Sequence, residues 1–196
     1  MTTFYLCRHG QTENNLHDRL SGWIDTPLTE EGLRNAAQAA AKLRTIAFDK
    51  IVSSDLGRSF TPAYLRARHL HYAGEIERYK GLREINYGNV IANMLVADVV
   101  EQFPHELVDV DFVPPGGESL CQMQQRVMAC LQQIAAANPH STIILISHDG
   151  TMNALYASFA GLDFGAVAAT RYNEHNFVAR ITYDGDKITT FEEITG

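Results

Sequence analysis

Four basic side chains at three distant places in the sequence could together bind a phosphoryl group. They are Arg8 with His9, Arg58, and His148. Guanidinium groups match the geometry of phosphate oxygens, and imidazole can act as a nucleophile or exchange protons. A single basic residue after a strand is usually part of a turn. The coincidence of three such places indicates phosphoryl chemistry.

The runs that precede these residues predict three buried parallel strands. Phe4–Cys7 and Thr142–Ser147 are rich in apolar and β-branched residues, and Lys50–Ser53 is a shorter run of the same kind. In an open parallel sheet, ligands bind beyond the carboxyl ends of the strands. We therefore expect the four basic side chains to meet at one edge of a sheet.

Helical patterns separate the strands. Thr29 is predicted to cap one helix, and Ser119 with Gln122 forms a capping box for another that ends at Asn138-Pro139. The first helix is expected to bury a stripe of Leu33, Ala36, Ala37, Ala40 and Leu43. The second is expected to bury Leu120, Met123, Val127, Leu131 and Ile134.

The C-terminal part predicts an antiparallel hairpin. Asn176–Tyr183 and Lys187–Ile194 flank the turn residues Asp184-Gly185-Asp186. With the alternation of strands and helices, this predicts a three-layer α/β/α sandwich with a mostly parallel central sheet and a C-terminal hairpin or antiparallel edge. No repeat or linker interrupts the chain, so residues 1–196 are expected to form one domain.

Composition narrows the class of protein. The chain has 196 residues, with 16 Lys and Arg against 23 Asp and Glu, a net charge of −7. This balance argues against binding to nucleic acid or a membrane surface, but a few arginines could still hold a small anionic substrate. The N-terminus lacks a secretory signal pattern, and Cys7, Cys121 and Cys130 include no Cys-x-x-Cys pair. A cytoplasmic protein with reduced thiols is expected.

Six blocks along the chain carry a family resemblance. They are Arg8–Thr12 with Asn15, Gly22–Gly32, Ser53–Arg58, Leu82–Gly88, Pro115–Ser119 and Ser147–Gly150. In this order they resemble the motifs of the histidine phosphatase superfamily, which has the phosphoglycerate mutase-like fold. The resemblance spans nearly the whole chain.

The resemblance implies roles for the matching residues. His9 would be the nucleophile that carries a covalent phosphoryl group. Arg8, Arg58 and His148 would bind the phosphoryl oxygens, with His148 as a cation whose pKa the phosphate raises. Glu84 would protonate the leaving alkoxide and then activate water, which requires a pKa raised by burial and by the adjacent phosphate.

Further residues are expected to complete the phosphate pocket, namely Asn15, Ser21, Gly22 and Asp149. Asp149 stands where the family commonly has glycine, and its carboxylate would repel phosphate unless it points away. No metal or cofactor is expected, since the arginines supply the positive charge. His69 and His71, beside Arg66 and Arg68, are predicted to lie on a solvated helix face, and the other histidines stand singly, which disfavours a metallohydrolase.

Two more positions depart from the family pattern. Val90-Ile91-Ala92 replaces a Trp-Glu-Gly-like run, and the sequence stays apolar to Phe103. Within the variable segment 86–114, this stretch is either a hydrophobic lid over the substrate or ordinary packing, including packing in a homodimer. Thr61-Pro62 replaces a polar pair, and the proline predicts a late start or a kink in the helix that carries Arg58.

The lack of basic residues in one segment distinguishes between phosphatase and mutase activity. Between Glu84 and Glu118 the chain has no Lys or Arg, so a second phosphate would find little to bind it there. Hydrolysis of a small phosphorylated metabolite is therefore favoured over a cofactor-dependent phosphoglycerate mutase. A specialised phosphatase of the α-ribazole phosphate type and a non-catalytic binder of phosphorylated ligands are further alternatives, and the sequence does not identify the substrate.

Overall fold

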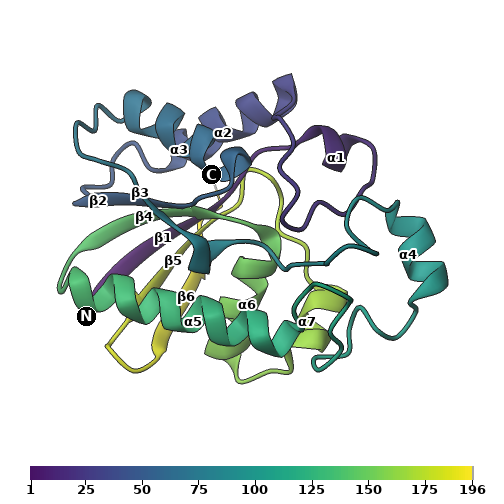
Figure 1. Ribbon diagram of the computed structural model, residues 1–196. Coiled ribbons are helices and arrows are strands. Elements are labelled where there is room, and N and C mark those ends of the chain that lie inside the picture. Colours follow the sequence, from purple (N-terminus) through teal and green to yellow (C-terminus); the bar gives the residue numbers. More distant parts are fainter. Residues whose placement is uncertain (196) are drawn as a thin grey trace.

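The protein is built around a six-stranded sheet, seen in a computed structural model that describes residues 1–195 (Figure 1). The strands are β1 (Thr2–Arg8), β2 (Lys50–Ser54), β3 (Glu77–Tyr79), β4 (Thr142–Ser147), β5 (Val178–Tyr183) and β6 (Ile188–Glu193). Their order is β3-β2-β4-β1-β5-β6; β3, β2, β4 and β1 are parallel, whereas β5 and β6 are antiparallel to their neighbours. The predicted parallel sheet with an antiparallel C-terminal edge is confirmed.

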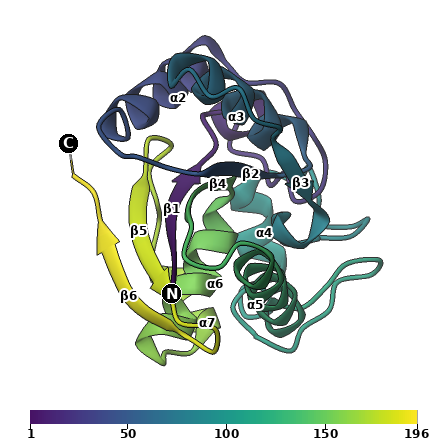
Figure 2. The same cartoon turned by 90° about the vertical axis from the view of Figure 1, so that its left-hand side faces the viewer.

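Helices cover both faces of this sheet. They are α1 (Glu13–Leu16), α2 (Glu30–Lys42), α3 (Gly57–His69), α4 (Val96–Gln102), α5 (Leu120–Ala137), α6 (Asp149–Ala160) and α7 (Phe164–Thr170), with a short 3-10 helix η1 (Lys80–Leu82). Figure 2 shows α2 and α3 on one face and α5, α6 and α7 on the other. Within residues 1–195, no helix combines the length and apolarity needed to cross a membrane.

The central strands are continuously apolar because each face of the sheet packs against helices. Phe4 and Leu6 of β1 lie in the core formed with α5 and α6. Tyr5 and Cys7 point to the opposite core, formed with α2 and α3. Successive residues of a strand point to opposite faces, so both sets are buried. This confirms the predicted three layers.

The predicted helix caps are confirmed. The Thr29 side chain accepts a hydrogen bond from the Gly32 backbone N–H at 3.0 Å. Ser119 and Gln122 form the capping box of α5. All five apolar positions expected on the inner face of α5 are buried. The predicted hairpin is formed by β5 and β6.

The buried face of α2 differs from the predicted stripe. Leu33 is 45% exposed and Ala37 is also exposed, whereas Gly32 and Ala39 are buried instead. Alanine is small enough to occupy either face of a helix, so the alanine-rich pattern does not define the orientation. The close packing of Gly32 against the backbone of Gln11 turns Leu33 outward.

Two details expected for α3 are wrong, namely a late start at Pro62 and a solvated Arg66. The helix begins at Gly57, well before Pro62, so the proline does not delay its start. Arg66 does not lie on a solvated face but is only 1% exposed. It follows Arg58 by eight residues, which puts both on the inner face of α3. His69 and His71 are exposed as expected.

The segment 86–114 includes α4, which lies on the side of the sheet where β1 and β4 end (Figure 1). Backbone hydrogen bonds tie it to the loop after α1. The Asn93 N–H donates to the Leu20 carbonyl at 2.6 Å, and the Val96 N–H donates to the Asp18 carbonyl at 2.8 Å. The segment is therefore held across the carboxyl edge of the sheet.

Candidate active site

Four predicted basic residues converge at this edge, and we call them the phosphate site: Arg8, His9, Arg58 and His148. Strands β1 and β4 are neighbours, and the His9 N–H donates to the Ser147 carbonyl at 2.9 Å. The imidazole rings of His9 and His148 are consequently 5.2 Å apart between centroids. Each of the four residues is at most 4% exposed.

The geometry of His9 leaves one ring nitrogen available. Nδ1 lies 2.7 Å from the Gly10 carbonyl oxygen, which can only accept, so Nδ1 carries the proton and Nε2 has a free lone pair. Burial, together with the positive charges of Arg58 and Arg8, holds the pKa of His9 well below its usual value near 6.5. The imidazole is therefore neutral and nucleophilic at pH 7.

Gly10 keeps this carbonyl in position because the loop packs directly on the start of α2. A Cβ atom on Gly10 would overlap the backbone carbonyl of Gly32. Only glycine at this position allows the two backbones to approach so closely.

Arg58 is held by backbone oxygen atoms. Its Nη1 donates to the Ile24 carbonyl at 2.8 Å and its Nη2 to the Gly22 carbonyl at 2.6 Å. The Asp25 carboxylate accepts hydrogen bonds from the backbone N–H groups of Gly57 and Arg58, and it lies 3.8 Å from the Arg58 guanidinium. Asp25 thus fixes the start of α3, although the sequence offered no local signal for this pairing.

Arg8 is oriented by the segment that follows α7. Its guanidinium donates to the Asn173 carbonyl and lies 4.6 Å above the centre of the Tyr172 ring. Asp149 is 3.8 Å from Arg8 Nη1. The Asp149 carboxylate also accepts hydrogen bonds from the backbone and side-chain N–H groups of Asn173, both at 2.9 Å. Asp149 is thus engaged with Asn173 and Arg8, and it acts on the site by orienting the guanidinium.

His148 is neutral in the free protein. Its Nε2 lies 2.9 Å from Ser54 Oγ, and Ser59 Oγ is 3.4 Å away. Burial and the charge of Arg58 hold the pKa of His148 well below its usual value near 6.5. If the Ser54 hydroxyl donates to Nε2, the proton sits on Nδ1, and His148 can donate to an anion without being a cation. The expected cationic form would require the phosphate dianion to arrive first.

Glu84 stands beside the phosphate site. Its carboxylate accepts hydrogen bonds from the backbone N–H groups of Ile85 at 2.9 Å and Gly150 at 3.2 Å. Burial raises the pKa of Glu84, and the nearby negative charge of Asp149 raises it further. The raised pKa is the direction that a general acid near neutral pH requires.

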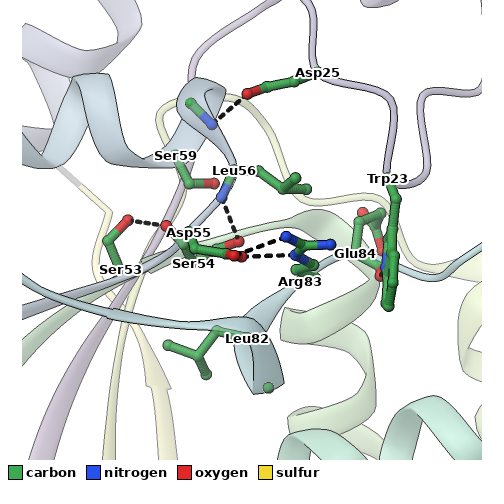
Figure 3. Close-up of polar contacts among 12 residues, drawn as sticks. Trp23, Asp25, Ser53, Ser54, Asp55, Leu56, Ser59, Leu82, Arg83 and Glu84 are labelled. Carbon is green, nitrogen blue, oxygen red and sulfur yellow. Dashed lines mark hydrogen bonds and ion pairs between the residues drawn. The ribbon is translucent and has the colours of Figure 1, made fainter.

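A polar cluster that no local sequence pattern indicates holds the backbone of Glu84 (Figure 3). The Trp23 indole N–H donates to the Glu84 carbonyl at 2.8 Å, and Arg126 donates to the same carbonyl at 3.2 Å. Arg83 lies 4.6 Å from the Trp23 ring centre and forms two 2.7 Å hydrogen bonds with Asp55. Glu84 is therefore connected to the loop after β2 through Arg83, its neighbour in the sequence.

The remaining predicted residues lie around the same edge. Asn15 Oδ1 accepts hydrogen bonds from Thr12, so it completes the cap of α1. Gly22 contributes its carbonyl to Arg58. The Ser21 hydroxyl is buried and has no hydrogen-bond partner among residues 1–195.

His175, which stands singly in the sequence, lies against the His9 ring. Its ring centroid is 5.9 Å from that of His9, and its Nδ1 is 3.2 Å from the His9 carbonyl oxygen. Burial lowers the pKa of His175 to about 4, so this ring adds no charge at pH 7. No motif pointed to it because its contact depends on the turn before β5.

Three residues near His9 have buried polar atoms that lack a partner within the described part of the chain. These atoms are Arg8 Nε, Arg58 Nε and His148 Nδ1. Buried polar groups in folded proteins are nearly always hydrogen-bonded. A group of donors left open beside a neutral imidazole is what an anion-binding site needs.

An α/β fold with this arrangement at its carboxyl edge defines a class of enzymes that act on phosphate esters. The chain belongs to the histidine phosphatase superfamily (branch 1), whose pattern matches residues 4–193. The expected phosphoglycerate mutase-like fold is thereby confirmed.

Individual relatives agree with this assignment. The chain is similar to the probable phosphoglycerate mutase GpmB of Proteus mirabilis, with 32% identity over 93% of this chain and 86% of the relative. Its fold matches that of Bacillus stearothermophilus YhfR with a TM-score of 0.86 and 26% identity, covering 96% of this chain and 94% of the other. A mycobacterial glucosyl-3-phosphoglycerate phosphatase bound to VO3 shares the fold at 24% identity and a TM-score of 0.83, covering 98% and 96%.

Proposed function

We propose that the protein is a metal-independent phosphatase that hydrolyses a small phosphate monoester through a phosphohistidine on His9. The observation that carries this proposal is the neutral His9 imidazole surrounded by buried donors without partners. A neutral Nε2 can attack phosphorus, and the donors can bind the oxygens on which negative charge resides.

In the first step, His9 Nε2 forms a bond to phosphorus while the bond to the ester oxygen breaks. The leaving alkoxide takes the proton of the Glu84 carboxyl group. In the second step, the Glu84 carboxylate accepts a proton from water as the oxygen attacks phosphorus and the P–N bond breaks. Inorganic phosphate leaves, and the Glu84 acid and the neutral imidazole are restored.

Trapping the intermediate tests this scheme. The protein is mixed briefly with a ³²P-labelled aryl phosphate and denatured. We expect a label that survives base and is lost in acid, as for phosphohistidine, and that is absent from His9→Ala. The exposed His69→Ala serves as a control that retains the label. A label that persists in His9→Ala, or activity that EDTA removes and a divalent ion restores, would contradict the scheme.

A phosphoglycerate mutase is a second candidate, because the Proteus relative bears that name. A mutase must also bind a second anionic group of the substrate. Residues 85–117 contain no Lys or Arg, so hydrolysis is favoured. Mutase activity is measured with 3-phosphoglycerate and a 2,3-bisphosphoglycerate primer. Formation of 2-phosphoglycerate faster than release of phosphate would reverse this choice.

The remaining alternatives make different predictions. A phosphatase of the α-ribazole phosphate type would prefer that nucleotide-like ester over simple alkyl esters, and a non-catalytic binder would turn over none.

The three cysteines are free thiols, which supports the expected location in the reducing cytoplasm.

A further inference from the structure

A cavity of about 480 Å³ opens beside Glu84, under the segment 86–114. We call it the apolar cavity, and its apolar wall includes Ile91, Val96, Val100, Phe103, Phe112 and Met123. Its volume is within the range of roughly 300–1000 Å³ that is usual for small-molecule sites. Because Glu84 and Gly150 also line it, the cavity begins where the leaving group of the ester would lie.

The shape of this cavity depends on residues that are themselves packed. Ile91 is 1% exposed, and Val99, which anchors α4, is fully buried. The hydrogen bonds from Asn93 and Val96 to the 18–20 loop hold the same segment from the other side. The part of the apolar wall around Ile91 is therefore fixed before a ligand binds, which reduces the entropy cost of binding.

The charges around the cavity are of one sign. Among the described residues that line it, none is Lys, Arg or His. Glu118 is neutralised by Arg126, whereas Glu106 and Asp109 have no such partner among residues 1–195 and lie at the outer part of the segment. A leaving group that carried its own anionic group would meet negative charge and no compensating cation.

We propose that the natural substrate is the phosphate monoester of an apolar alcohol or phenol with no second anionic group, whose organic part fills the apolar cavity. This rests on the proposed phosphatase function and goes beyond it by naming the chemical class of the leaving group. The phosphate site would bind the phosphoryl group of any ester, and the cavity would select among esters.

The first experiment measures kcat/KM for ethyl, butyl and hexyl phosphate, and for propyl phosphate against 3-phosphoglycerate. Each methylene transferred into the cavity is expected to raise kcat/KM about fourfold. We expect 3-phosphoglycerate to be slower than propyl phosphate by about tenfold or more. A flat alkyl series, or a preference for 3-phosphoglycerate, would overturn the proposal.

A binding measurement separates failure of this inference from failure of the proposed function. If no ester is hydrolysed, the phosphatase function fails. Calorimetric titration with ethyl-, butyl- and hexylphosphonate, which cannot be hydrolysed, then tests the cavity directly. Affinity that rises about fourfold per methylene supports an apolar ligand, and affinity that is independent of chain length overturns it.

A matched pair of variants tests whether the organic part of the substrate binds in the apolar cavity. Val100 is 56% exposed and lines the cavity, whereas Val90 is 48% exposed and lies outside it. Val100→Lys is expected to lower the ratio of kcat/KM for hexyl phosphate over 3-phosphoglycerate about tenfold or more, because it adds a cation to an apolar wall. Val90→Lys is expected to keep the wild-type ratio. Equal ratios in the two variants would overturn the assignment to this cavity.

Discussion

The phosphate site is built from the ends of strands and helices, whereas the apolar cavity is built largely from the connection between η1 and α5. Arg8 is the last residue of β1, His9 follows it, and His148 follows β4, so all three are positioned by the register of neighbouring strands. The cavity wall depends on α4 and on loop contacts. The first region would perform chemistry common to many esters, and the second would decide which ester is used. Changes in the two regions should therefore have different kinetic effects.

The largest effect is expected from His9→Ala in the phosphate site. Loss of the nucleophile should lower kcat by about 10⁴-fold for every ester, whatever its leaving group. Steady-state hydrolysis of p-nitrophenyl phosphate and hexyl phosphate measures this, with His69→Ala as the control. Loss that is confined to hexyl phosphate would contradict the division between the two regions.

Glu84 lies between the two regions. The effect of replacing it on the rate of hydrolysis should depend on the chemistry of the leaving group. Glu84→Gln cannot donate the proton that an alkoxide needs, so hexyl phosphate should slow by about 10²-fold or more. A p-nitrophenolate leaving group needs no proton and should slow much less.

The kcat values of the two esters test this prediction. Glu101→Gln, an exposed change outside the cavity wall, is the control. Equal slowing of both esters by Glu84→Gln would show that Glu84 is not the acid.

The two regions also differ in how far the sequence predicts them. The phosphate site follows from local signals, since a continuously apolar run such as Phe4–Cys7 indicates a buried parallel strand and the basic residues come directly after it. The cavity could not be predicted, because an apolar run such as Val90 to Phe103 is compatible with a lid, with core packing or with an interface. Which of these structures the run adopts depends on its contacts with the 18–20 loop, which is far away in the sequence.

Residues that support the site were missed for the same reason. The pairing of Asp55 with Arg83 and the contact of Arg126 with the Glu84 carbonyl join residues that are distant in the chain. Arg66 was misplaced because a charged residue is usually solvated, whereas the orientation of α3 buries it. The apolar spacing of α5 predicts its buried face, whereas the polar sequence of α3 contains no such stripe, so the orientation of α3 depends on tertiary packing.

A smaller and more selective effect is expected from Phe103→Ala in the cavity wall. The ratio of kcat/KM for hexyl phosphate over methyl phosphate should fall about tenfold, because the hexyl group loses an apolar partner. The competing possibility is that Phe103 only supports the fold. In that case both esters would slow equally and the unfolding temperature would fall, so the ratio and a thermal melt are measured together.

The smallest effect is expected from Asp149→Asn, which changes the pH dependence of catalysis. Glu84 must be protonated to act as an acid, so alkyl phosphate hydrolysis should decline as the pH rises through its pKa. The negative charge of Asp149 raises that pKa. Removing the charge therefore lowers the pKa, and the decline should begin at a lower pH than in the wild type.

The measurement is kcat for hexyl phosphate across the pH range, with Asp111→Asn as an exposed control of equal charge change. Because Asp149 also lies near Arg8, Asp149→Asn should weaken phosphate binding and raise KM. A profile that coincides with the wild type would show that Asp149 does not influence the acid. A shift toward higher pH would contradict the electrostatic argument itself, since loss of a nearby anion can only favour the Glu84 carboxylate.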